Sequence, residues 1–211
     1  GAILVGNVAA LRQVRLKLMV AYSTVAQIGY LFLMFPLAFG AGATQVAGAT
    51  ALAGGMMQAI AHAFAKAAMF MAAGLIYAGL GHDRVGGLAG VGRALPMTVF
   101  AFGLAGVSLI GLPPSGGFMA KWLLLTAAVE TGHWVWAVVM LLGGLLTTGY
   151  VLLVLVRALA VPPSPLVLCA PVPRHRQAVT LALALIAALL GLVAFAGADL
   201  LAVGRVAGGI P

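Results

Sequence analysis

The chain has 211 residues, of which 64% are hydrophobic and only 7% are charged. Soluble domains carry charge on about a quarter of their residues, so this composition excludes a soluble enzyme and indicates a membrane protein. The single cysteine, Cys169, excludes an internal disulfide. The net charge of +8 comes from cations scattered singly among apolar runs rather than from a basic patch, so nucleic acid is not expected as a partner.

Long apolar runs without alternation predict an all-α polytopic membrane protein and not a β-barrel. The first run, residues 1–11, is too short to cross about 30 Å of hydrocarbon and is expected to be the end of a truncated helix. Residues 158–177 are rich in proline and predict a loop, and the last span is expected to face lipid. In a single membrane domain covering 1–211, the expected spans are 18–39, 46–80, 94–129, 134–156 and 178–201.

The run 94–129 contains the segment Pro-Pro-Ser-Gly-Gly, which is either a loop between two spans or a break within one. The part after it, Phe118 to Val129, is only about 18 Å long as a helix, too short to span. Length therefore favours one helix that is broken at Pro113, Pro114, Gly116 and Gly117.

The placement of the cations favours the same topology. With one broken span, only Arg205 falls on one side of the membrane, and the other side holds Arg12, Arg15, Lys17, Arg84, Arg93, Arg157, Arg174 and Arg176. Such a bias is typical of cytoplasmic loops. We therefore expect a multi-pass protein of the inner (plasma) membrane with its Arg-rich loops in the cytoplasm.

Gln58, His62 and Lys66 follow one another at four-residue steps, so a helix projects all three from one face. A lysine at membrane depth costs about 2.5–3.5 kcal/mol, and Lys66 lies too far from either end of its run to snorkel easily. These three residues are candidates for a buried functional site. The alternatives are a snorkelling lysine and a histidine that is bonded to a neighbouring carbonyl.

Lys121 follows the break by four residues. Prolines free backbone groups from the helix ladder, and such backbone is tolerated at membrane depth only where protein covers it or water reaches it. A broken helix beside a cation is typical of ion paths in transporters. The alternative is a simple proline kink with an outward-pointing Lys121.

Two further features are open to two interpretations. Lys17, with Arg12 and Arg15 before it, fits an ordinary cytoplasmic anchor as well as it fits a pathway residue. Ser23 and Gln27 share one helix face, which fits a polar lining or ordinary interhelical hydrogen bonds. Titratable groups inside an apolar bundle predict a proton or cation pathway, here through His62, Lys66, Lys121 and Lys17, lined by Gln58, Ser23 and Gln27.

Three segments resemble motifs of one family, the antiporter-like membrane subunits of respiratory complex I, Mrp-type Na+/H+ antiporters and membrane-bound hydrogenases. Residues 16–30 read LKLMVAYSTVAQIGY and resemble LKRLLAYSTVSQIGY. Residues 58–70 read QAIAHAFAKAAMF and resemble THAFFKALLF, and residues 108–125 read SLIGLPPSGGFMAKWLLL and resemble SLAGLPPFSGFWGKLLL. The last segment looks closest to the D-type subunits of Mrp antiporters.

The resemblance implies a proton-translocating subunit of about fourteen helices in two inverted repeats, of which this chain matches the C-terminal half. It places Lys17 before the tenth helix, and His62 and Lys66 in a broken eleventh helix. Lys121 then matches the lysine of the broken twelfth helix that is thought to gate the exit half-channel. This sequence departs from the pattern at Gln58, where many relatives have histidine, and the essential Glu and Lys pair of the first repeat would lie upstream of Gly1.

The resemblance further implies partners: the lipid bilayer, other membrane subunits of a larger complex, and H+ with or without exchange for Na+. If the host is an NADH:quinone oxidoreductase or a hydrogenase, this subunit is not catalytic alone. No cofactor is expected, because the sequence lacks a ligand set for flavin, iron–sulfur or haem. The alternative function is that of a non-transporting structural or assembly remnant of the same family.

Overall fold

The computed structural model describes residues 1–162 and 166–196, with side chains through Val193 outside the gap. The span expected to end at residue 201 thus runs beyond the described residues, and Arg205 lies outside them. In this part of the chain the structure is helical and contains no strand. Its elements are α1 (Ala2–Leu11), α2 (Leu16–Phe32), α3 (Met34–Phe39), α4 (Gln45–Leu80), the 3-10 turn η1 (Val85–Gly87), α5 (Val91–Ala94), α6 (Pro96–Ile110), α7 (Gly116–Glu130), α8 (Trp134–Leu159) and α9 (Arg174–Ala196).

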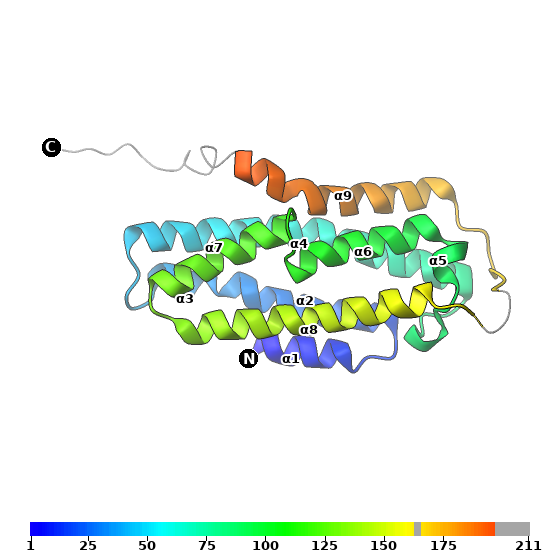
Figure 1. Ribbon diagram of the computed structural model, residues 1–211, viewed down its shortest axis with the longest axis horizontal. Helices are drawn as coiled ribbons and strands as arrows, with labels where there is room; N and C mark the ends of the chain where they lie inside the picture. Colours follow the sequence, from blue (N-terminus) through cyan, green and yellow to red (C-terminus); the bar gives the residue numbers. More distant parts are fainter. Residues whose placement is uncertain (163–165, 197–211) are drawn as a thin grey trace.

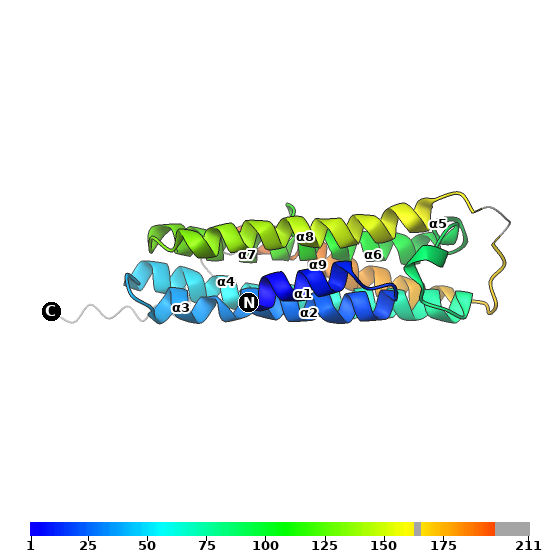
Figure 2. The same cartoon turned by 90° about the horizontal axis from the view of Figure 1, so that it is seen from below.

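The long helices run side by side along the long axis of the bundle (Figure 1). Seen from below, α6, α7 and α8 lie on one side, and α1 to α4 lie on the other (Figure 2). Four described segments are long and apolar enough to cross a membrane: Leu16–Phe39, Gln45–Leu80, Trp134–Leu159 and Arg174–Val193. The chain is therefore an all-α polytopic membrane protein.

The helix break lies between α6 and α7. These two helices lie end to end along the long axis of the bundle (Figure 1). The helix α6 ends at Gly111, whose φ of +88° is a left-handed conformation that favours glycine. The second half of the broken helix, α7, begins after Ser115. The Ser115 side chain caps it by accepting a hydrogen bond from the Phe118 backbone N–H, at 3.1 Å. The break therefore comprises residues 111–115. Gly116 and Gly117, expected within it, are instead the first residues of α7.

These two glycines lie where the start of α7 packs against α6 and α4. A side chain at Gly117 would overlap with the backbone oxygen of Ser108 in α6. A side chain at Gly116 would come within 3.0 Å of the Ala61 side chain in α4. The glycines thus permit close packing at the start of α7 rather than a loose chain.

The helix α4 is continuous over 36 residues, although the resemblance implied a broken helix here. It contains no proline, and both of its ends are capped. The Thr44 side chain accepts a hydrogen bond from the Ala47 backbone N–H, and Gly81 closes the helix with a φ of +73°. All three of Gln58, His62 and Lys66 thus lie on one uninterrupted helix.

The helix α9, expected to face lipid, packs one face against α4, α6 and α7. Ala184 and Ala187 are buried there, while Leu192 and Val193 stay exposed. A side chain at Gly191 would overlap with the backbone oxygens of Pro114 and Ser115, so α9 also covers the break. Covering protein is what broken backbone requires at membrane depth.

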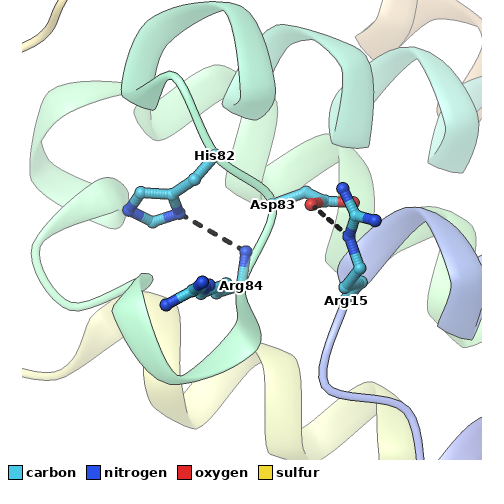
Figure 3. A network of polar contacts seen from close by, with 4 residues as sticks. All are labelled: Arg15, His82, Asp83 and Arg84. Carbon is cyan, nitrogen blue, oxygen red and sulfur yellow. Dashed lines mark hydrogen bonds and ion pairs between the residues drawn. The ribbon is translucent and has the colours of Figure 1, made fainter.

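At one end of the bundle, the loop before α2 is joined to the loop after α4 by what we call the Arg15–Asp83 clasp (Figure 3). The Arg15 Nε donates to Asp83 Oδ1 at 3.1 Å. Two backbone hydrogen bonds run beside this pair, from Leu16 N to Asp83 O at 2.7 Å and from Val85 N to Val14 O at 2.9 Å. The clasp fixes the ends of the two helices that carry the polar residues described next.

Candidate functional site

Lys66 is buried, with 6% of its surface exposed, so it does not snorkel out of the bundle. Its Nζ donates to the Val20 carbonyl oxygen at 2.6 Å and to the Ser23 hydroxyl, both on α2. The Phe70 ring centroid lies 5.9 Å from the amine. Within the described structure, the groups that Lys66 contacts on its neighbours are thus neutral.

One turn along α2 from Ser23, Gln27 forms the next polar contact. Its Oε1 accepts from Gln58 Nε2 on α4 at 2.9 Å, and its Nε2 donates to the Leu109 carbonyl oxygen on α6 at 3.3 Å. Ser23, Gln27 and Gln58 are all buried. The expected lining residues thus lie together, and Gln27 connects three helices.

Lys121 points into the break. Its Nζ donates to the carbonyl oxygens of Leu109, at 2.6 Å, and Ile110, at 3.0 Å, and it lies 4.5 Å from the centroid of the Tyr30 ring on α2. Its aliphatic stem passes Gly111, where a side chain would come within 2.8 Å of Lys121 Cδ. Lys121 therefore turns inward, contrary to the proline-kink alternative.

The two prolines explain why these carbonyls are free to accept from a lysine. In an α-helix the oxygens of Leu109 and Ile110 would accept from the N–H groups four residues on, which are positions 113 and 114. Both are proline and have no N–H. The Pro-Pro pair thus leaves two acceptors at the end of α6, and Lys121 occupies them.

The two lysines are connected through α2 and the break. Lys66 donates to Ser23, Gln27 follows one turn later, and both Gln27 and Lys121 donate to the same oxygen, that of Leu109. We call Ser23, Gln27, Gln58, His62, Lys66 and Lys121 the lysine cluster. Among the described residues, the ion pair found is Arg15 with Asp83, so no carboxylate there neutralises Lys66 or Lys121.

His62 is half-buried on the same face of α4. Its Nδ1 is buried and has no hydrogen-bond partner among the described residues, which does not support the alternative of a carbonyl-bonded ring. His62 lies one helical turn before Lys66 on α4.

Lys17 is not part of the lysine cluster. It lies in the first turn of α2, half-buried, with its Nζ 4.0 Å from the Tyr77 ring centroid. This position is at the clasp end of the bundle. A role of Lys17 in the pathway stays a prediction.

The sequence did not reveal a second set of buried polar residues between α1 and α8. The Thr147 hydroxyl lies 3.0 Å from Asn7 Oδ1 and 2.8 Å from the Gly143 oxygen, and Asn7 Nδ2 donates to the Gly143 oxygen at 3.2 Å. Tyr150, one turn after Thr147, is also buried. The available signal was a single asparagine in the first apolar run and the three-residue spacing of Thr147 and Tyr150.

The fold and the site together define a helical membrane protein that holds two lysines inside its bundle, one of them at a broken helix. Residues 1–147 match the family described as NADH:quinone oxidoreductase/Mrp antiporter, TM. The chain belongs to this family, as its three motifs indicated.

Individual relatives agree with this assignment. Subunit N of the NADH-quinone oxidoreductase of Desulforudis audaxviator is 37% identical over 148 residues, which cover 70% of this chain and 28% of that protein. Subunit N of the F(420)H(2) dehydrogenase of Methanosarcina mazei is 36% identical over 159 residues, covering 69% of this chain and 29% of that protein.

Solved structures share the fold. A chain in the Mrp complex from Dietzia sp. DQ12-45-1b matches with a TM-score of 0.82 and 25% identity, over 95% of this chain and 43% of that one. A chain in respiratory complex I from Thermus thermophilus with bound Aureothin matches with a TM-score of 0.65 and 26% identity, over 91% and 41%. This chain thus spans less than a third of these curated relatives and about two fifths of these solved chains.

Proposed function

We propose that this chain is the C-terminal half of a proton-conducting, antiporter-like subunit and moves H+ through Lys66, His62 and Lys121. The observation that carries the proposal is the Leu109 carbonyl, which the Pro-Pro break frees and which Lys121 and Gln27 share. It joins the two lysines into one polar route inside an apolar bundle. Intramembrane ionisable groups of this kind mark proton relays.

The chemistry follows from the groups present. An amine, a hydroxyl and an imidazole can each accept and release a proton, and neutral oxygens hold a lysine without fixing its charge through a counter-ion. Water molecules held by Ser23, Gln58 and His62 would carry protons between the amines. A change of charge at one lysine would then alter the proton affinity of the next, because Coulomb interactions are strong away from bulk water.

The finer assignments also belong to this proposal. The named relatives are subunits of an NADH-quinone oxidoreductase and an F(420)H(2) dehydrogenase, and one structural match is a chain of an Mrp complex. We propose that this chain likewise works beside other membrane subunits in the plasma membrane, with the clasp end in the cytoplasm. The ends of α1, α4 and α8 and the start of α9, which carry most of the arginines, lie at that end (Figure 1).

The test replaces Lys121 by alanine at the chromosomal locus and measures H+ flux in vesicles from the variant cells. Lys121→Ala should abolish flux, because the carbonyls of the break lose the amine that they bind, while the amount of assembled complex stays unchanged. Lys66→Ala should reduce flux less severely. Arg157→Ala is the matched control, since it removes an exposed cation from the end of α8 and should leave flux unaltered.

The same experiment decides between conduction and the structural alternative. A non-transporting assembly remnant predicts that Lys121→Ala leaves flux at the unaltered level when the complex is intact. That result would overturn the proposed function. Adding or withholding Na+ in the same vesicles shows whether H+ moves alone or in exchange.

A further inference from the structure

A cavity of about 680 Å³ opens beside the Arg15–Asp83 clasp, and its lining includes Arg15, Tyr77, His82, Asp83 and Arg84. A second cavity, of about 640 Å³, shares His82 and Arg84 with the first. Volumes of this size are typical of sites for small molecules. The described lining of the two cavities contains no residue of the lysine cluster, so they form a separate feature of the molecule.

The charges at the larger cavity are mostly positive. Asp83 is neutralised by Arg15, whose Nε donates to it. The Arg84 side chain is exposed and has no ion-pair partner among the described residues. The Lys17 amine lies 4.0 Å from the ring centroid of Tyr77, which lines the cavity. The excess of positive charge favours an anion as the ligand.

The backbone of the clasp holds two arginines opposite each other. Arg15 and Arg84 pair in an antiparallel bridge, flanked by the two backbone hydrogen bonds of the clasp. Like charges that are directly opposite in such a pair are destabilising. The Arg84 side chain extends away from Arg15, to the side of the loop on which His82 lies (Figure 3). An anion bound by Arg84 would offset the repulsion between the two arginines.

His82 provides a second donor next to Arg84. Its Nδ1 accepts from the Arg84 backbone N–H at 3.4 Å (Figure 3), so the ring proton lies on Nε2. A side chain at Gly87 would come within 2.7 Å of His82 Cε1, so the absence of a side chain at Gly87 makes room for the ring. The guanidinium and the imidazole thus line the same two cavities, and each can donate to an anion.

The larger cavity lies at the level of the lipid headgroups. Arg15 directly precedes the apolar segment Leu16–Phe39, which is long enough to cross a membrane. Val14 and Tyr77, which also line the cavity, are 72% and 43% exposed. Tyrosines are enriched at membrane interfaces, and basic pockets between membrane helices bind anionic headgroups. The combination of cations with exposed apolar side chains therefore fits a lipid.

We propose that this cavity binds the phosphate of an anionic membrane phospholipid. Arg84 and His82 donate to the phosphate oxygens, and Val14 and Tyr77 contact the apolar part of the lipid. Arginine suits this role because its planar guanidinium can donate two parallel hydrogen bonds to a phosphate. A free phosphate ion has the same anionic chemistry but would leave the apolar lining without a partner. The lipid site does not depend on the proposed proton route, so either can fail alone.

The test is photo-cross-linking in membranes that contain the full complex, with phosphatidylglycerol that carries a photoreactive headgroup as the probe. Peptide mass spectrometry locates the cross-links, which should fall within residues 77–87. Unlabelled phosphatidylglycerol should displace the probe, whereas phosphatidylcholine and inorganic phosphate should not. Displacement by inorganic phosphate would assign the site to a soluble anion and overturn the proposal.

The decisive variant is Arg84→Gln. At subsaturating probe it should lower cross-linking to residues 77–87 about fivefold, which corresponds to the contribution of one cation near an anionic lipid. The fold should be kept, because the Arg84 side chain forms no hydrogen bond or ion pair among the described residues. Arg157→Gln is the matched control, since it removes the same charge from an exposed position at the end of α8 and should leave cross-linking unchanged.

Equal cross-linking in the Arg84→Gln variant and the unaltered complex would overturn the lipid site. If that result came with loss of another subunit from the Arg84→Gln complex, the surface would belong to a protein partner instead.

Discussion

At the scale of single residues, the site depends on what the residues of the break lack. Pro113 and Pro114 lack the N–H groups that would occupy two carbonyls of α6, and these carbonyls bind Lys121. Gly117 lacks a side chain and so lets α7 start against Ser108. The position of the Lys121 amine therefore depends on residues that contribute no charged group.

Gly117→Ala should disturb the break, because its new methyl group would overlap with the Ser108 backbone oxygen rather than with a flexible side chain. We expect a loss of about 1–3 kcal/mol in unfolding free energy, typical of overpacking, and a reduced H+ flux. Thermal unfolding of the detergent-purified protein measures the first effect. Gly74→Ala is the control, since nothing lies within 4 Å of its added carbon, and equal stability of the two variants would contradict the packing argument.

Residue chemistry also explains which site residues the sequence predicted. Gln58, His62 and Lys66 were found because their four-residue spacing fits a helix face, and one continuous helix carries them. Tyr150 and Asn7 were not, because a single polar side chain in an apolar run is common. Whether such a side chain matters depends on which helix packs opposite it. The local sequences of α1 and α8 do not predict that these two helices pack together.

At the scale of helices, apolar run length predicted the elements well and their interruptions less well. The expected broken helix at 94–129 is confirmed as α6 and α7, since the 12-residue remainder could not span alone. The break expected from the resemblance within α4 is absent from the structure, because no proline interrupts that helix. The close packing of α9 was also missed, since its contacts are made by alanines and a glycine that lack a distinctive pattern.

The Arg15–Asp83 clasp leads to a prediction at this scale. The Asp83 side chain is 5% exposed, but that of Arg15 is 59% exposed, so water screens the pair. Arg15→Ala should therefore cost only about 0.5–1 kcal/mol in unfolding free energy. Adding Asp83→Asn should restore part of this loss, because it removes the buried charge that Arg15→Ala leaves unpaired.

Thermal unfolding of the two single variants and the double variant completes this cycle. A double variant whose loss equals the sum of the single losses would contradict a direct Arg15–Asp83 interaction.

At the scale of the whole molecule, several helices together position the residues of the lysine cluster. The helix α4 carries Lys66 and α7 carries Lys121. Both lysines contact α2, Lys66 through Val20 and Ser23 and Lys121 through the Tyr30 ring. Ser23 and Gln27, both uncharged, lie along this route. Ser23 accepts a hydrogen bond from the Lys66 amine, and Gln27 donates to the Leu109 oxygen that also accepts from Lys121. We propose that protons pass between Lys66 and Lys121 along this side of α2.

The measurement that tests this claim most directly is H+ flux in vesicles from cells carrying Gln27→Leu, with both lysines in place. The matched control is Gln177→Leu, because Gln177 is also a buried glutamine with two hydrogen bonds, to Thr98 and to the Val172 oxygen, but lies on α9 outside the lysine cluster. Losing the two hydrogen bonds of Gln27 should lower flux at least about fivefold, while Gln177→Leu keeps flux near the unaltered level. Equal flux in the two variants, with equal amounts of assembled protein, would contradict a proton route through Gln27.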